Sequence, residues 1–474
     1  MLRKLLSHAA IYGLAAQLPR VAGVLALPVI TPYLTPTDYG VAGVMSAYLA
    51  ALTLVHSLGL GTVEMNSFVK YPLRYKWIWR QIHGFMLLWS VMYGLLMFAV
   101  LYAVVPDEAS GNELVLVLLQ VIPVAFLAPT SGYGGTTFLL RQQPMSIAWR
   151  SFVAGLMMVA LNIYFIAEMR LGYMGWFYAS FCSEVILFLL YFKKVYFDEK
   201  IWPIFRFKMH RIRHSLRIGL PMVPHNFSTF LLDASDKLVM DALKIPITRI
   251  GSYNLASSFG LYFSAASGAL EQAASPFYYQ YYAKSKDKAA LLSARKMTLT
   301  MQAFFLMTTF AVSIWLKEVF QLLIKNNVLQ QAYPLAIVIL MGYNYRPMYW
   351  AVVNRLAYEE KTKVLWKISL VAGLGNVLLN LLLIPYYGIE AAAFTTFAAL
   401  MYMGYSGFML KEYKQLPRIP HYPLLWLMAT TGLLLLSYYL SDVAVLVKVM
   451  ITGSLLTLVT LWVVLNIKTT KSVV

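Results

Sequence analysis

Long apolar segments dominate the chain, and its polar residues are concentrated in short connections between them. Runs of about 20 apolar residues, enough for a helix to cross a bilayer, recur from end to end. We predict fourteen transmembrane helices, near residues 9–34, 39–64, 81–105, 114–138, 151–168, 173–192, 216–242, 250–272, 297–316, 332–354, 364–386, 389–410, 422–440 and 445–466. The expected fold is an all-α polytopic membrane protein.

Composition supports this interpretation. Hydrophobic residues make up 60% of the chain and charged residues 12%, whereas an ordinary soluble domain has about 25% charged residues. The first apolar run is longer than a signal-peptide core and lacks a small-residue cleavage site, so we expect it to remain as a span. A lone Cys182 excludes a disulfide framework and a cysteine metal site.

The net charge of +19 is distributed unevenly over the connections. Alternate connections, counted from the N-terminus, hold thirty of the 39 basic residues, and the opposite connections hold six. This asymmetry predicts cytoplasmic N- and C-termini. It explains the basic excess without a nucleic-acid partner, and contact with anionic membrane lipids is a second use for it.

The chain contains an internal repeat. Val153-Ala154-Gly155-Leu156, Leu161-Asn162 and Ile166 recur 218 residues later as Val371-Ala372-Gly373-Leu374, Leu379-Asn380 and Ile384. The segment that begins at Gly172 is mirrored 216 residues later by the one that begins at Gly388. Small residues that pack helices can also recur by chance, but the shared spacing favours two related halves.

The longest polar connection, residues 193–215, separates spans one to six from spans seven to twelve. Because six is even, the halves share an orientation and are related by an axis along the membrane normal. We predict two pseudo-symmetric six-helix lobes, 1–192 and 216–410, joined by a basic cytoplasmic linker, 193–215. Residues 411–474 form two additional helices. Carriers rock such lobes around a central site.

Ionisable residues at membrane depth usually face an interior cavity. On a continuous span seven, Asn226, Asp233, Asp236, Lys237 and Asp241 fall on one helical face. Asp233 and Lys237 can instead form a neutral pair that only packs the bundle. We favour a cavity wall, because Asp236 has no obvious local partner.

Span one carries Gln17 and Arg20 on one face, and Arg20 lies near mid-span. A guanidinium stays charged and binds phosphate oxygens in bidentate fashion, so Arg20 is a candidate anion-binding residue. A structural ion pair with an acid of span seven is the alternative.

Span ten places Tyr343, Arg346, Tyr349 and Trp350 on one face near mid-span. A guanidinium beside aromatic rings suits a ligand that is anionic at one end and sugar-like along its body, and an interfacial aromatic belt is the alternative. Glu271, towards the cytoplasmic end of span eight, is a candidate gate or cation site, or an interface residue.

Signatures of enzymes are absent from the sequence. There is no phosphate-binding Gly-x-x-x-x-Gly-Lys motif, no histidine pair with metal-ligand spacing and no arguable Ser/His/Asp arrangement. We therefore predict no catalytic residues, no metal site and no cofactor. The acids near other span ends, Glu64, Glu168, Glu184 and Glu390, are expected at unremarkable interfacial positions.

Several loose motifs occur together in a consistent order over about residues 5–410. They are the segment from Leu27 to Gly40, Gly219-Leu220-Pro221-x-x-Pro224-His225, Asp233-x-x-Asp236-Lys237, Ala273-Ala274-Ser275-Pro276-Phe277-Tyr278, and the Gly172 and Gly388 motifs. With them the chain resembles the O-antigen and polysaccharide flippases of the multidrug/oligosaccharidyl-lipid/polysaccharide exporter superfamily.

The resemblance implies a V-shaped pair of lobes around a cationic cavity. It also implies transfer of an undecaprenyl-diphosphate-linked oligosaccharide from the inner to the outer leaflet of the bacterial inner membrane, with other polysaccharide-assembly membrane proteins as possible partners. The related lipid II flippases use an arginine in span one, which Arg20 matches. Their span-eight cation is missing here, and Glu271 stands in that region. Arg346 then supplies a second positive charge, and Asp233, Asp236 or Glu271 binds a coupling Na⁺ or H⁺.

Three other functions compete with this interpretation. A cation-coupled multidrug exporter of the same fold would favour acidic over basic cavity residues. A lipid II flippase would use much the same machinery. A membrane polysaccharide polymerase or acyltransferase usually has a substantial extracytoplasmic loop or paired catalytic residues, and the predicted outer loops are short.

Overall fold

The computed structural model describes residues 18–457 apart from 207, 285 and 418, and these residues form helices and connections without any strand. Eight helices in this part of the chain are long and apolar enough to cross a membrane. One of them, Thr362–Met409, has 48 residues, enough to cross twice. The predicted all-α polytopic fold is confirmed.

The N-terminal half forms one group of helices. Its members are the helix Leu18–Tyr33, α2 (Pro36–His56), α3 (Gly61–Lys70), α4 (Tyr75–Ala103), α5 (Glu113–Ile122), α6 (Ala128–Leu140), α7 (Pro144–Ile163) and α8 (Tyr173–Phe192). Short π-helical segments join α5 to α6 and extend α7 and α8 to residues 168 and 198. The connection to the second group contains α9 (Met209–Gly219).

The C-terminal half forms the second group. Its members are α10 (Met222–Asp233), α11 (Ser235–Ala242), α12 (Ile247–Ala283), α13 (Lys288–Ile314), α14 (Leu316–Leu323), α15 (Asn327–Gln330), α16 (Tyr333–Gly342), α17 (Arg346–Tyr358), α18 (Leu365–Tyr405), α19 (Lys411–Lys414), α20 (Pro423–Leu440) and the helix Val445–Thr457. Ion pairs join this last helix and the loop before it to the segment of α14: Lys448 of the helix lies 2.6 Å from Glu318, and Asp442 of the loop lies 2.6 Å from Lys317.

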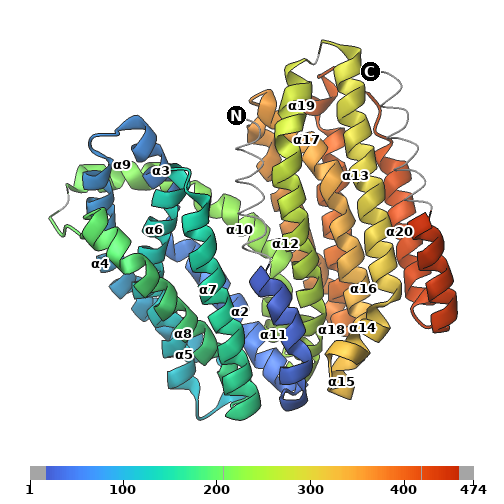
Figure 1. Ribbon diagram of the computed structural model, residues 1–474, viewed down its shortest axis with the longest axis horizontal. Coiled ribbons are helices and arrows are strands. Elements are labelled where there is room, and N and C mark those ends of the chain that lie inside the picture. Colours follow the sequence, from blue (N-terminus) through green and yellow to red (C-terminus); the bar gives the residue numbers. More distant parts are fainter. Residues whose placement is uncertain (1–17, 207, 285, 418, 458–474) are drawn as a thin grey trace.

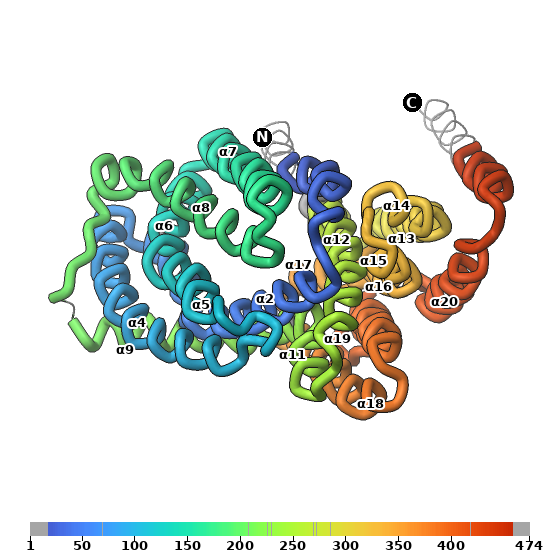
Figure 2. Tube along the Cα trace, turned by 90° about the horizontal axis from the view of Figure 1, so that it is seen from below, coloured from blue at the N-terminus to red at the C-terminus, as the bar shows by residue number. Residues whose placement is uncertain are grey.

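The two groups form a V (Figure 1). They meet at the lower end of the view and diverge at the upper end, where α3, α9, α17 and α19 lie. The connection that contains α9 also runs at this upper end, so the V opens on the side of the basic linker. Figure 2 shows the same two groups from below, with α2 and α12 between them.

The repeat in the sequence corresponds to a repeat in backbone conformation. Gly172 and Gly388, which are 216 residues apart, have φ/ψ of 53°/−133° and 65°/−148°. Both precede a long apolar helix segment, α8 in one half and the second part of α18 in the other. Glycine tolerates this region of φ and ψ because it has no Cβ, so the repeated glycine preserves the same break in both halves.

α2 and α12 meet in a reciprocal contact. A Cβ on Gly40 would lie 2.1 Å from the carbonyl oxygen of Ile247, and one on Gly251 would lie 1.8 Å from that of Pro36. The two contacts are equivalent, because Gly40 and Gly251 are 211 residues apart and so are Pro36 and Ile247, as expected when two related helices cross near a pseudo-twofold axis. The glycines allow the two backbones to touch at the closed end of the V.

Candidate functional site

A cavity of about 620 Å³ lies between the N-terminal group and α12. The helix Leu18–Tyr33 and residues of α2, α5, α7 and α8 form one side, and residues 254–262 of α12 form the other. Its lining is mixed, with leucine, valine and aromatic side chains beside serine, asparagine and glutamine. A cavity of this size can hold a substantial part of a small ligand or head group.

Arg20 lies on this lining and is exposed. It follows Pro19, against which α7 packs closely, since a Cβ on Gly155 would lie 2.4 Å from the Pro19 Cβ. Gly155 belongs to the repeated Val-Ala-Gly-Leu motif, so part of that motif serves this helix contact. Among the described lining residues the charged side chains are Arg20 and Glu184.

Glu184 is a cavity residue that the sequence did not predict. We expected an interfacial position for it, but it lines the cavity from α8, together with Phe177 and Ser180. These residues are spaced i, i+3 and i+7, the spacing of one helical face. That spacing was the available signal. It was obscured because α8 is apolar on most of its circumference.

Asp236 lies at the centre of a second, closed polar site, and it is 3% exposed. Asn376 and Asn380 of α18 donate to its Oδ1 at 2.8 and 2.6 Å. Thr396 donates to its Oδ2 at 2.8 Å, and Tyr253 of α12 donates to the same oxygen. The carboxylate is thus surrounded by neutral oxygen- and nitrogen-bearing side chains from α12 and α18.

The prediction of one continuous polar face on span seven is wrong. The helix is interrupted at Ala234, where φ is −143°, so α10 ends at Asp233 and α11 begins at Ser235. The interruption changes the direction of the side chains that follow. Asp233 is exposed at the end of α10, whereas Asp236 is enclosed.

The remaining predicted residues of span seven lie apart from one another. Lys237 is 8% exposed and interacts electrostatically with Asp236 and Asp233. Asn226 is exposed on α10. Asp241 accepts a hydrogen bond from Tyr48 of α2 at 2.8 Å, which links the two halves. Gln17, predicted beside Arg20, lies outside the described residues.

Arg346 belongs to a third polar cluster, in the C-terminal group. It donates to Ser264 of α12, and its guanidinium lies 5.4 Å from the ring centroid of Tyr343. Asp233 and Glu271 interact with it electrostatically. Arg346 is half-buried and is not on the lining of the large cavity, so Arg20 and Arg346 do not share one cavity wall.

The two other aromatic residues predicted on span ten differ in exposure. Tyr349 is partly exposed and lies 5.9 Å from Tyr345, between ring centroids. Trp350 is 2% exposed and packs edge-on against Phe305 at 5.5 Å. Because Trp350 is buried, a ligand cannot reach its ring in this conformation.

The described residues offer little for a multivalent metal. They contain no group of three or more His, Cys, Asp or Glu side chains that could hold a metal ion. The Asp236 site has one carboxylate with amide and hydroxyl groups around it, a donor set suited to a single monovalent cation or a proton.

Comparisons with known proteins identify the fold. No protein-family model matches this chain, and no curated protein matches it in sequence. A structure of the lipid II flippase MurJ in an inward closed conformation aligns with a TM-score of 0.65 at 12% identity, covering 94% of this chain and 97% of MurJ. An inward-facing multidrug resistance MATE family transporter of the MOP superfamily aligns with a TM-score of 0.57 at 14% identity, covering 90% and 95%.

A mutant of the Vibrio cholerae MATE transporter VcmN aligns with a TM-score of 0.51 at 13% identity, covering 87% of this chain and 95% of VcmN. All three alignments extend over most of the length of both chains; two of the matched proteins are described as MATE transporters and the third as a lipid II flippase. The chain therefore has the fold of the MOP superfamily transporters, and it is a multi-pass membrane protein.

Proposed function

We propose that this protein is a flippase that moves undecaprenyl-diphosphate-linked oligosaccharide, a repeat unit of O-antigen, capsule or exopolysaccharide, from the inner to the outer leaflet of a bacterial inner membrane. The observation that carries the proposal is Arg20, an exposed cation on the wall of the cavity between the lobes. The order of the sequence motifs supports this substrate through the resemblance to the O-antigen and polysaccharide flippases, and lipid II is the alternative substrate.

The physical task explains why such a cavity is needed. A diphosphate with several sugars cannot cross hydrocarbon, because its charges and hydroxyls would lose their hydrogen bonds to water. A polar cavity carries the head group while the lipid tail stays in the bilayer. In this scheme Arg20 binds the diphosphate, and Asn254 and Ser258 offer polar contacts to the sugars from α12.

The V shape supports alternating access. We propose that the lobes, residues 1–192 and 216–410, open towards the cytoplasm in the present conformation, with both termini on that side, and that residues 411–474 add two helices outside the cycle. Rocking about the α2–α12 contact then exposes the cavity to the outer leaflet. Arg346, Lys237, Asn226, Tyr343 and Tyr349 serve as further head-group contacts when the C-terminal lobe turns towards the cavity.

A coupling ion gives the cycle its direction. We propose that Asp236 binds Na⁺ or H⁺ within its ring of Asn376, Asn380, Thr396 and Tyr253, and that Asp233 and Glu271 balance Arg346 on the same lobe. Entry of the cation would displace the asparagine NH₂ groups from the carboxylate and alter the packing of α18 against α11. Occupancy therefore changes the shape of this lobe.

The test of the substrate is a flipping assay in proteoliposomes. A fluorescent undecaprenyl-diphosphate oligosaccharide is reconstituted with the purified protein, and its accessibility to an added quencher is followed over time. Arg20→Gln should slow flipping at least tenfold, because it removes the charge that binds the diphosphate. Arg170→Gln, an exposed arginine that stacks on Tyr33 outside the cavity, is the matched control.

Two results would reject the proposal. One is an Arg20→Gln variant that flips the lipid as fast as the control. The other is faster movement of lipid II or of a cationic drug than of the oligosaccharide lipid in the same vesicles. Either of these would assign the cavity to one of the alternative substrates.

The test of coupling uses Asp236→Asn in the same vesicles. The amide preserves the size of the side chain but removes the negative charge that a cation needs. With an imposed Na⁺ or pH gradient, we expect the native protein to accelerate and the variant to show no response to either gradient. A variant that still responds would place the ion elsewhere, at Asp233 or Glu271.

A further inference from the structure

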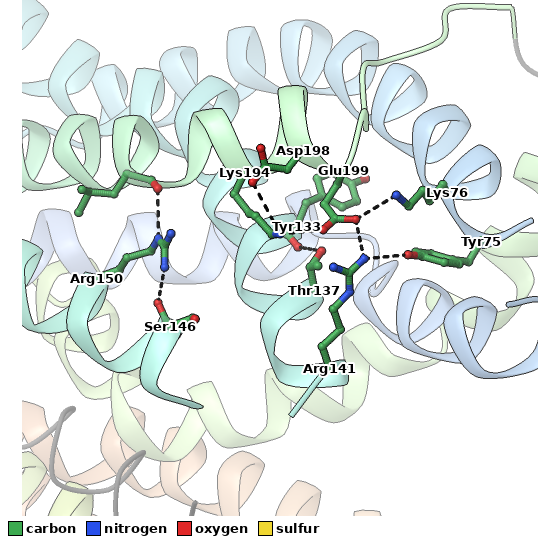
Figure 3. Close-up of polar contacts among 11 residues, drawn as sticks. Tyr75, Lys76, Tyr133, Thr137, Arg141, Ser146, Arg150, Lys194, Asp198 and Glu199 are labelled. Atoms are coloured by element: carbon green, nitrogen blue, oxygen red, sulfur yellow. Dashed lines mark hydrogen bonds and ion pairs between the residues drawn. The ribbon is translucent and has the colours of Figure 1, made fainter. Parts of the chain in front are cut away.

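The linker between the lobes is fixed to the N-terminal lobe where it begins. The Glu199 carboxylate, with its side chain 3% exposed, lies 2.6 Å from Arg141, 3.0 Å from Lys76 and 3.0 Å from Lys194. Figure 3 shows these groups converging from α4, α6 and the end of α8. The ion pairs hold the start of the linker against the same end of the lobe from which α9 extends.

α9 then packs against this end along one face. A Cβ on Gly219 would lie 2.5 Å from the carbonyl oxygen of Leu58, so the helix touches the turn between α2 and α3. Ile212 and Ser215 are buried on the same side. The Arg211 guanidinium stacks on the Trp77 ring at 4.3 Å. One face of α9 is therefore used for folding.

The opposite face of α9 is exposed and strongly basic. Its exposed cations, with those of the segment before it, are Arg206, Lys208, Arg213 and Arg217. The chain contains no acidic residue between Glu199 and Asp233, so no nearby carboxylate in the sequence neutralises this face. The surface has the charge that attracts an anionic partner.

Exposed apolar side chains border the basic face. Met209 is 60% exposed and Ile218 is 36% exposed. They are nine residues apart, which places them on opposite sides of the helix with the arginines between them. Leu220 and Phe205, at the two ends of the segment, are 46% and 56% exposed. Cations flanked by apolar side chains are typical of helices that lie in a membrane interface.

The position of α9 agrees with this chemistry. Viewed from below, α9 lies at the outer edge of the N-terminal group, beside α4 (Figure 2). α4 is a candidate membrane span, and Met92 and Leu95 on it are 70% and 69% exposed, as expected for lipid-facing residues. A helix at this edge, at the end of the spans, lies where lipid head groups are.

We propose that the exposed face of α9, with Arg206, Arg213 and Arg217, binds the anionic phospholipid surface of the leaflet on the basic side of the protein. The head-group phosphates pair with the arginines while Met209 and Ile218 enter the boundary between head groups and acyl chains. This inference is independent of the transported substrate. The bound helix anchors the N-terminal lobe and the linker, so that the C-terminal lobe is the half that moves.

The experiment uses the full chain in vesicles of phosphatidylcholine with increasing amounts of phosphatidylglycerol. A polarity-sensitive fluorophore is attached at Ile218→Cys in a Cys182→Ser background. We expect its emission to shift to shorter wavelength as phosphatidylglycerol increases. Raising the ionic strength from about 0.05 to 0.5 M should reverse the shift, because it shortens the screening length.

Charge variants test the specificity of the contact. The α9 variant combines Arg206→Gln, Arg213→Gln and Arg217→Gln. The phosphatidylglycerol fraction needed for half of the emission shift should rise severalfold in this variant, since each basic residue near an anionic surface strengthens binding roughly fivefold. The matched control, Lys284→Gln, Lys286→Gln, Lys288→Gln, removes the same charge from exposed residues beside α13 and should leave the midpoint unchanged.

The proposal is overturned if the labelled protein with all three arginines intact has the same emission in neutral and anionic vesicles. It is also overturned if the control variant moves the midpoint as far as the α9 variant does, because net charge alone would then explain the attraction. The salt reversal needs no charge variant, so a folding defect in the triple substitution cannot decide the result.

Discussion

Equivalent positions in the two halves of the molecule form a closed polar site in one half and a cavity wall in the other. In the C-terminal half, Tyr253, Asn376, Asn380 and Thr396 close around Asp236. Their repeat partners in the N-terminal half, at offsets of 211, 218 and 216 residues, are Ala42, Met158, Asn162 and Ser180, and all four line the large cavity. Equivalent helices therefore enclose the packed Asp236 site in the C-terminal lobe and line the large cavity in the N-terminal lobe.

Side chains make part of this difference, alongside the interruption of the helix at Ala234. The break at Gly172 and the break at Gly388 have nearly the same φ and ψ, so the helices approach in a similar way. A tyrosine at 253 reaches Asp236, where the alanine at 42 leaves space. A duplicated scaffold can therefore provide an ion site in one half and a head-group site in the other.

The largest expected effect comes from breaking the symmetric contact itself. Gly251→Ala would place a Cβ 1.8 Å from the carbonyl oxygen of Pro36, a backbone atom that cannot rotate away. We expect α2 and α12 to separate at the closed end of the V, at a cost of about 2–3 kcal/mol. A lower unfolding temperature in detergent would reveal it.

The control is Gly375→Ala on α18. A Cβ there has nothing within 4 Å, so alanine should keep or slightly raise stability through its better helix propensity. If Gly251→Ala and Gly375→Ala unfold at the same temperature, the tight α2–α12 contact does not hold the lobes together.

A smaller effect on stability should distinguish the packed site around Asp236 from the equivalent position in the N-terminal lobe. Asn380 donates to Asp236 at 2.6 Å and accepts from Thr395, whereas its repeat partner Asn162 has a buried Oδ1 without a hydrogen-bond partner. Asn380→Ala should cost about 1–3 kcal/mol, because it leaves buried polar groups unpaired. Asn162→Ala should change stability by less than about 0.5 kcal/mol.

Thermal unfolding of both variants, measured side by side in one detergent, checks the difference. The two substitutions remove the same atoms from equivalent positions, so each is the control of the other. Equal losses of stability would mean that the hydrogen bonds of Asn380 in the Asp236 site contribute no more to stability than Asn162 does in the N-terminal lobe.

Much of the architecture could be predicted from the sequence. The apolar runs are long enough to cross a bilayer, so the all-α polytopic fold could be predicted from hydrophobicity. The Gly172 and Gly388 motifs also predicted equivalent positions, because a glycine with positive φ is needed at both. Arg20 on the cavity wall was accessible to the same reasoning, since an arginine at mid-span has few other places to lie.

The interior of the C-terminal lobe could not be predicted in the same way. The prediction of one polar face on span seven assumed a continuous helix, and no proline or glycine marks the interruption at Ala234. Helix periodicity also cannot show which of several neighbours a polar face meets. For this reason Trp350 was expected near a ligand but packs on Phe305, and Glu184 was assigned to an interface but lines the cavity.

The smallest expected effect concerns the buried carboxylate of Glu199, which differs from that of Asp236 in its position. Asp236 lies among the C-terminal spans, whereas Glu199, at the start of the linker, lies just beyond α8 and is held against the N-terminal lobe. Burial would raise the pKa of Glu199, but Lys194, Lys76 and Arg141 together lower it below its usual value of 4.5. Because the folded-state pKa is the lower one, this stabilisation is present above about pH 4.5 and disappears as the pH falls through the folded-state pKa.

Glu199→Gln should therefore lower the unfolding temperature at pH 7 by the equivalent of about 1 kcal/mol, since the three cations are partly exposed and can be rehydrated. At pH 3 the native protein and the variant should converge, because the native carboxylate is then losing its charge. The measurement is thermal unfolding of both proteins from pH 3 to pH 8. A gap that stays constant over this range would show that Glu199 acts through its shape and not its charge, and that the linker is held to the N-terminal lobe by packing alone.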